Sequence, residues 1–273
     1  MKTRVIAGIC MAPLLLVLYV GSYPLIAITA CIAFIGIKEF YNGFEALGVK
    51  PGRTLAYVLI SILYIGHICF VLTNNEDFLN YWAIIWLIVA FATSLMYGWK
   101  INERGPYDAV CTTIGLCYVV FFSYFIVLID VKMHYMVWIV VLASFGSDIM
   151  AYFTGYLIGK HKLAPVLSPK KTIEGAVGGL VGAGIICAIF GGIIEGFGIA
   201  ILIRFFIVGA VCGGISQCGD LTASAFKRKM GIKDYGTLIP GHGGIMDRFD
   251  SVIFTAPFVY IFVIILSQYQ GIL

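Results

Sequence analysis

The chain has 273 residues, of which 61% are hydrophobic and only 12% are charged, and its formal net charge is +4. An ordinary soluble domain carries about 25% charged residues, so this composition excludes a soluble globular protein. Apolar runs of about 17–25 residues, long enough to cross a bilayer, recur along the chain. The sequence therefore predicts an integral membrane protein.

These runs predict an all-α polytopic protein with about nine transmembrane helices. The runs are continuous rather than alternating, which excludes a membrane β-barrel. The N-terminal run is interpreted as a retained first span, because no convincing cleavage site follows it and a second apolar run begins at once. The predicted spans cover residues 5–20, 24–37, 55–72, 81–97, 109–128, 135–155, 174–194, 199–216 and 252–267.

The loop charges predict the orientation. One alternating set of loops holds 16 of the 18 lysines and arginines, whereas the opposite set holds only Lys132, and Arg204 lies within a span. Positively charged loops stay on the cytoplasmic side of a membrane. We therefore expect a multi-pass protein of the inner (plasma) membrane, with its N-terminus in the cytoplasm and its C-terminus outside.

Two cytoplasmic stretches, Ser147–Gly175 and Ser216–Asp250, interrupt the apolar pattern. They contain nine of the 16 cytoplasmic basic residues and six acidic ones. We expect residues 1–134 to form N-terminal transmembrane helices and residues 135–273 to form a catalytic transmembrane region, within a single integrated membrane domain. Glycine pairs spaced four apart in the seventh span, Gly175/Gly179 and Gly178/Gly182, predict close helix packing.

The second stretch predicts a helix over 219–229 with a polar face. That face would carry one carboxylate, one hydroxyl and two cations, at positions i, i+4, i+7 and i+8. The residues are Asp220, Ser224, Lys227 and Arg228.

A glycine-rich turn follows, at residues 240–244. Such a turn can present several backbone N–H groups to one anion. For His242, within the turn, a phosphate contact and a structural hydrogen bond remain equal alternatives.

Asp220 ends the eighth span and Asp247 begins the ninth, so the two would meet at one site. Paired carboxylates beside lysines and arginines suit Mg²⁺ and a polyphosphate. A positive loop that only fixes topology would explain the basic residues, but not these aspartates.

The same stretch resembles the signature of the phosphatidate cytidylyltransferase (CDP-diacylglycerol synthase) family. Some fifteen positions agree in type and spacing, and the motif resemblance covers roughly residues 145–255. Tyr156 stands where many relatives would carry arginine. The matching segments are Ser224–Arg228, Lys233–Asp234, Leu238–Asp250, Gly219–Leu221, Gly159–Leu163, Pro165, Ser168–Thr172 and Glu174–Gly175.

The resemblance implies transfer of CMP from CTP to phosphatidate, giving CDP-diacylglycerol and pyrophosphate. It implies Mg²⁺ held by Asp220 and Asp247, with room for a second cation, and it suggests a homodimer and no nucleic-acid partner. The candidate catalytic residues are Asp220, Lys227, Arg228 and Asp247. The candidate substrate-binding residues are Lys160, Lys170, Lys171, Ser224, Lys233, His242, Gly243, Gly244 and Arg248.

Two alternatives stay open on the residues alone. One is a cytidylyltransferase or kinase that acts on another membrane lipid, such as a polyprenol. The other is a transporter of anionic substrates with the basic loops as a gate, although no internal or inverted repeat is visible. Incorporation of labelled CTP into lipid separates all three.

Overall fold

The structure is a computed structural model that describes residues 16–100, 102–238 and 243–270. Residues 5–15 of the first predicted span, 5–20, lie outside this range, and residues 16–20 are helical. The chain forms two compact units. Unit 1 comprises Met1–Val131 and Lys229–Phe249, and unit 2 comprises Lys132–Arg228 and Asp250–Leu273.

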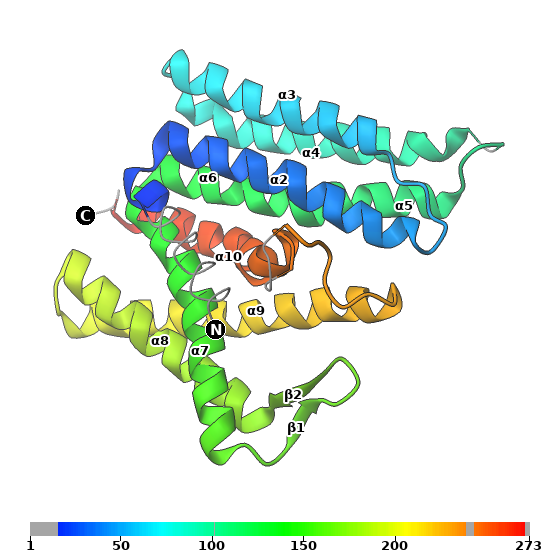
Figure 1. The fold of residues 1–273 in the computed structure, drawn as a ribbon. Coiled ribbons are helices and arrows are strands. Elements are labelled where there is room, and N and C mark those ends of the chain that lie inside the picture. The colour runs from blue at the N-terminus through cyan, green and yellow to red at the C-terminus, as the bar shows by residue number, and fades with distance from the viewer. Residues whose placement is uncertain (1–15, 101, 239–242, 271–273) are drawn as a thin grey trace. The chain divides into compact units, whose positions relative to one another are not determined.

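Unit 1 is a bundle of apolar helices, drawn from blue to green in Figure 1. Indole nitrogens tie α4 to α3, because Trp86 Nε1 donates to the Leu59 carbonyl at 2.8 Å and Trp82 Nε1 to the Leu63 carbonyl at 3.1 Å. A π-helical segment, Leu116–Phe121, joins α5 to α6. The helices are α2 (Ser22–Glu45), α3 (Arg53–Leu72), α4 (Leu79–Met96), α5 (Pro106–Gly115) and α6 (Phe122–Met133), with short 3-10 turns at Glu76–Phe78 and Tyr97–Trp99.

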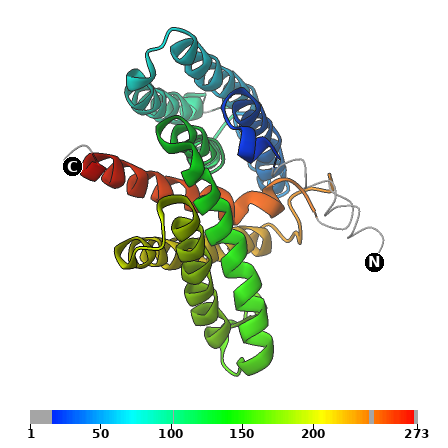
Figure 2. The same cartoon turned by 90° about the vertical axis from the view of Figure 1, so that its left-hand side faces the viewer.

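Unit 2 is built on two helices that pack side by side along much of their length, α7 and α8 (Figures 1 and 2). A 3-10 turn, His134–Met136, precedes α7. The elements are α7 (Val137–Ile158), β1 (Lys162–Ala164), β2 (Ser168–Thr172), α8 (Ile173–Glu195), α9 (Ile199–Lys229) and α10 (Met246–Gln270), of which residues from Asp250 onward belong to this unit.

Glycines explain the close approach of α7 and α8. A Cβ atom added to Gly179 would lie 2.8 Å from the Ser147 carbonyl oxygen, and one added to Gly175 would lie 2.7 Å from that of Ala151. Real side chains do not tolerate such contacts with backbone, so only glycine permits this packing. The predicted role of the glycine pairs in helix packing is confirmed.

Seven helical segments are long and apolar enough to cross a membrane among the residues that the structure describes. The all-α polytopic class is confirmed. Within the described residues, the β1–β2 hairpin is the one element that is not helical. Its strands pair antiparallel, with Lys162 opposite Thr172 and Ala164 opposite Ser168. Ser168 is extended, as a residue that precedes a proline usually is.

Candidate active site

A cavity of about 560 Å³ lies between α7, α8 and the hairpin of unit 2. Its volume is typical of a site for a small organic molecule. Lys162, Lys170 and Lys171 line it from the hairpin, Asp148 lines it from α7, and Gln217 lines it from α9. The cavity is therefore mainly basic on its hairpin side.

One carboxylate at the start of α8 fixes the base of the hairpin. Glu174 accepts hydrogen bonds from the backbone N–H groups of Lys160, at 3.0 Å, and His161, at 3.2 Å, and its other oxygen lies 2.6 Å from His161 Nδ1. Thr172 Oγ1 caps α8 by accepting from Gly175 N at 3.1 Å. These bonds set the position at which β2 enters α8, and so the position of the lysines before it.

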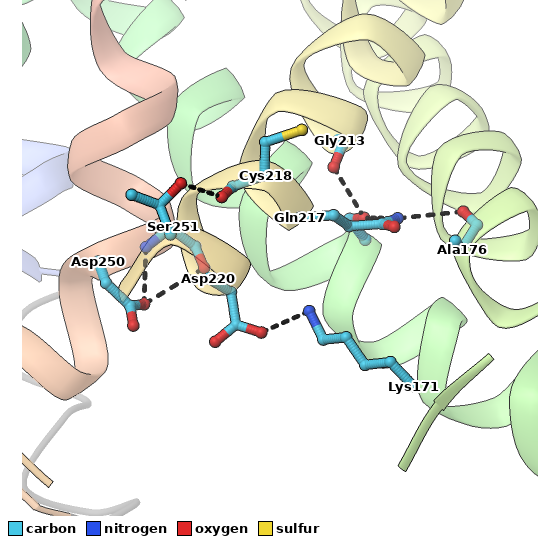
Figure 3. A network of polar contacts seen from close by, with 10 residues as sticks. Lys171, Ala176, Gly213, Gln217, Cys218, Asp220, Asp250 and Ser251 are labelled. Atoms are coloured by element: carbon cyan, nitrogen blue, oxygen red, sulfur yellow. Dashed lines mark hydrogen bonds and ion pairs between the residues drawn. The ribbon is translucent and has the colours of Figure 1, made fainter. Parts of the chain in front are cut away.

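Lys171 forms an ion pair with Asp220 of α9 (Figure 3). Both side chains are partly exposed, at 25% and 29%. The pair joins the cavity to the predicted catalytic carboxylate, so a ligand phosphate in the cavity would lie near Asp220.

Two further carboxylates surround Asp220. Asp148, on α7, is close enough to interact electrostatically with both Lys171 and Asp220. Asp250, on α10, interacts electrostatically with Asp220 and Lys227 and is only 5% exposed. Its Oδ1 accepts the Ser251 N–H at 2.7 Å. Helices α7, α9 and α10 thus each place a carboxylate in the same region of unit 2.

Gln217, one turn before Asp220, ties three helices together (Figure 3). Its side-chain nitrogen donates to Ser147 Oγ at 2.9 Å and to the Ala176 carbonyl at 3.0 Å. Ser147 Oγ in turn donates to the Gly213 carbonyl at 3.1 Å. A buried amide with several partners fixes the rotation of α9, and with it the direction in which Asp220 projects.

The predicted helix over 219–229 is confirmed as the last part of α9. Asp220, Ser224 and Lys227 are partly exposed on it and Arg228 is exposed. At 31 residues α9 is about 46 Å long, which exceeds the roughly 30 Å of a hydrocarbon core. Its polar end therefore has room to extend beyond the apolar region of a bilayer.

The described part of the glycine-rich segment lies in unit 1, as does Lys233, whose side chain is exposed. Asp247 Oδ2 accepts the backbone N–H groups of Tyr235, at 2.7 Å, and Gly244, at 2.9 Å. Gly243 has φ of +84°, and a Cβ atom there would lie 2.8 Å from Asp247 Oδ2. The segment is folded around this carboxylate.

A second carboxylate, not anticipated from the sequence, holds the same segment. Glu39 of α2 is 6% exposed and accepts the N–H groups of Ile245, at 3.1 Å, and Met246, at 2.8 Å. The only signal in the sequence was a charged residue near the end of an apolar span, which is costly to bury and often functional.

The structure brings together some of the predicted residues. Lys170 and Lys171 line the cavity, and Lys171 pairs with Asp220. Neither Asp220 nor Lys160 lines the cavity itself. Lys233, Gly243, Gly244, Asp247 and Arg248 belong to unit 1. The predicted meeting of Asp220 and Asp247 therefore stays a prediction, and His242 lies outside the described residues. Sequence reasoning missed the roles of Asp148, Lys162 and Gln217 in lining the cavity, and that of Asp250 near Asp220.

The donor set near Asp220 is compatible with Mg²⁺ accompanied by phosphate. Within the described ranges, no three His, Cys, Asp or Glu side chains are grouped to hold a metal ion. Mg²⁺ usually takes only one or two carboxylates and completes its shell with phosphate oxygens and water. The partly exposed carboxylate of Asp220 can supply one such ligand.

These features define a polytopic α-helical membrane protein with a basic cavity beside clustered carboxylates. The model of the cytidylyltransferase family matches residues 2–266. A phosphatidate cytidylyltransferase of Staphylococcus haemolyticus is 34% identical over 266 residues, covering 96% of this chain and 97% of the relative. One of Bacillus subtilis is 31% identical over 283 residues, covering 98% and 99%. The chain belongs to the cytidylyltransferase family, which confirms the resemblance found in its motifs.

Proposed function

We propose that this protein is a phosphatidate cytidylyltransferase, which transfers CMP from CTP to phosphatidate and releases pyrophosphate. The observation that carries this proposal is similarity over nearly the whole chain to relatives with that name, at 31–34% identity. The basic cavity beside Asp220 supports it, since both substrates are phosphates.

In this reaction an oxygen of the phosphatidate phosphate attacks the α-phosphorus of CTP. The bond between the α-phosphorus and the bridging oxygen breaks, and pyrophosphate leaves with the electron pair. The attacking phosphate is already anionic at neutral pH, so the protein needs no strong base. It needs alignment of the two substrates and neutralisation of their charge.

The lysines of the hairpin and the cations of α9 supply that neutralisation. Lys170 and Lys171 border the cavity, and Lys227 and Arg228 lie two turns beyond Asp220 on α9. Mg²⁺, held by Asp220 and Asp247, would supply further stabilisation of charge on the reacting phosphates. Asp220 pairs with Lys171 in this structure. If Asp220 held the metal, the Lys171 ammonium would be available to a phosphate.

We also propose nine membrane crossings with the N-terminus and the active site in the cytoplasm. The segment Pro106–Ile158 has 53 residues, about 80 Å if fully helical, which is enough for two crossings of roughly 30 Å each. Its backbone leaves the helical conformation at Met133 (φ −161°, ψ 81°). Counting it twice gives eight crossings, and the run at residues 5–20 would add the ninth. A reporter fused to Leu273 should then read outside, and a cytoplasmic reading would contradict the count.

The decisive experiment for the activity uses purified protein in mixed micelles with phosphatidate and CTP labelled at either the α- or the γ-phosphorus. We expect only the α-label in the lipid product, and no product with EDTA. A γ-label in lipid would instead indicate a kinase. Incorporation into a polyprenyl phosphate but not into phosphatidate would assign the other lipid. If neither the α- nor the γ-labelled CTP gave a labelled lipid, the proposal would be overturned.

A further inference from the structure

The cavity of unit 2 is bordered on one side by exposed aromatic side chains. Tyr152 and Tyr156 line it and are 69% and 79% exposed, and their rings stack with centroids 6.4 Å apart. They belong to α7, within a segment apolar enough to cross a membrane. Tyrosine is typical of the level of lipid head groups. If α7 crosses the bilayer, this side of the cavity is suited to contact with lipid.

The opposite side of the cavity is cationic. The side chains of Lys162 and Lys170 are exposed on the hairpin, and Lys171 is part-buried against Asp220. An ammonium group binds phosphate as a compact point charge. A ligand that suits both sides has a phosphate at one end and an apolar body at the other. The base of a nucleoside triphosphate could stack on the tyrosines, but a nucleotide has no acyl chains to cover the exposed apolar side of α7.

We propose that this cavity is the phosphatidate subsite of the enzyme. The phosphate lies between Lys162 and Lys170, the glycerol backbone lies against Tyr152 and Tyr156, and the acyl chains leave along the exposed side of α7. The ion pair of Lys171 with Asp220 lies at the inner end, so the phosphate enters facing the catalytic carboxylate. This assignment rests on the proposed function, and it leaves CTP to other residues.

Photo-crosslinking tests the assignment without turnover. Tyr156→p-benzoylphenylalanine is irradiated with labelled phosphatidate in micelles containing excess phosphatidylglycerol. We expect capture that unlabelled phosphatidate suppresses at least fivefold and CTP does not. In a Lys162→Gln/Lys170→Gln background, capture should fall at least fivefold. Phe197→p-benzoylphenylalanine is the control, because Phe197 is 68% exposed in unit 2 but does not line the cavity.

Three outcomes would overturn the assignment: equal capture at both positions, suppression by CTP as strong as by phosphatidate, or full capture in the double lysine variant. Failure of the proposed function is distinct from these. A protein that captures phosphatidate at position 156 but transfers no CMP would refute the reaction and keep the lipid site.

A second inference rests on Glu39, in the other unit. Its two carboxylate oxygens accept the backbone N–H groups that begin α10, next to Asp247. Gly236 and Gly244 approach so closely that a Cβ atom on either would collide with the Glu39 carboxylate. Gly244 also donates to Asp247. The glycine-rich segment therefore packs around two carboxylates at once.

Burying a carboxylate in an apolar helix is costly unless hydrogen bonds compensate it. Two backbone donors at a helix N-terminus provide such compensation, because charge-assisted bonds and the helix dipole both favour an anion there. We infer that Glu39 is a positioning residue of the reaction, which acts by holding Gly244–Asp247 in its reactive conformation. This inference also rests on the proposed function.

Kinetics of Glu39→Gln test the role. Glutamine keeps the volume and one acceptor oxygen but turns a donor towards the second N–H. We expect kcat to fall at least tenfold, with the KM values for CTP and phosphatidate within twofold of wild type, in protein that elutes normally on size exclusion. Glu45→Gln is the matched control, since Glu45 lies on the same helix and pairs with Arg53 at the surface. Unchanged kcat in Glu39→Gln, or a loss explained by the amount of folded protein, would overturn the inference.

Discussion

The ion pair of Lys171 with Asp220 connects the end of β2 to the C-terminal third of α9. A lysine in contact with a carboxylate is held in place before any ligand arrives, and it screens the charge of that carboxylate. Substrate phosphate and metal would each compete for one partner of the pair. Through this contact, the hairpin and α9 would both respond to the same ligand.

Asp220→Asn should reduce kcat at least a hundredfold, corresponding to roughly 2.7 kcal/mol of lost transition-state stabilisation. Asparagine keeps the shape but loses the charge that pairs with Lys171 and would hold Mg²⁺. The variant should remain extractable as a folded protein. Steady-state turnover at saturating CTP, phosphatidate and Mg²⁺ is the measurement. Activity near that of wild type would remove Asp220 from the reacting centre.

The two groups of lysines should differ in their kinetic effects. Lys227→Gln is expected to lower kcat and kcat/KM together, because charge that develops in the transition state is no longer stabilised. Lys170→Gln should mainly raise the KM for phosphatidate, by roughly tenfold if about 1.4 kcal/mol of binding is lost. Lys50→Gln is the control, because Lys50 is exposed in unit 1 and does not line the cavity. The opposite pattern between Lys170 and Lys227 would reverse the assignment.

Gly243→Ala should impair catalysis more than Gly231→Ala. Both glycines have positive φ, +84° and +71°, so alanine costs about 1–2 kcal/mol of backbone strain at either. Only at Gly243 would the added Cβ press on the Asp247 carboxylate, whereas nothing lies within 4 Å at Gly231. We expect similar losses of thermal stability but a kcat at least tenfold lower for Gly243→Ala. Equal kcat values would show that Asp247 tolerates displacement.

Glu195→Ala should affect stability and not activity. Glu195 pairs with Arg204 and accepts a hydrogen bond from Tyr135 at 3.1 Å, so its removal leaves a part-buried guanidinium without this partner. The loss is about 1–2 kcal/mol, which corresponds to a lower Tm in detergent by a few degrees. The kcat/KM values should stay within twofold of wild type. A large kinetic defect at unchanged Tm would contradict a purely structural role.

Local spacing was enough to predict the part of the site that lies on α9. The positions of Asp220, Ser224 and Lys227 follow from the helical repeat, and the structure confirms that helix. The spacing of the glycine pairs of α8 likewise predicts close helix packing, since that packing requires only that a side chain be absent. In both cases the determining interactions lie within a few residues of one another.

The hairpin and Glu39 escaped prediction for a different reason. The strands contain three and five residues and are rich in lysine, so they show no apolar alternation. Their geometry depends on Glu174, which binds the backbone on the far side of the turn. Glu39 bonds to residues more than two hundred positions away. The spacing of residues in a single sequence therefore predicts neither the contact of Glu174 with the hairpin nor that of Glu39 with the start of α10.

The continuity of α9 has one more consequence. Eight residues separate Asp220 from Arg228, a rise of about 12 Å along a single unbroken helix. The backbones that carry the carboxylate and the cations therefore keep a constant spacing, whether or not a nucleotide is present. The backbone that carries these side chains already loses its conformational freedom when the helix folds. Less of the binding free energy is therefore spent on ordering that backbone when a ligand binds.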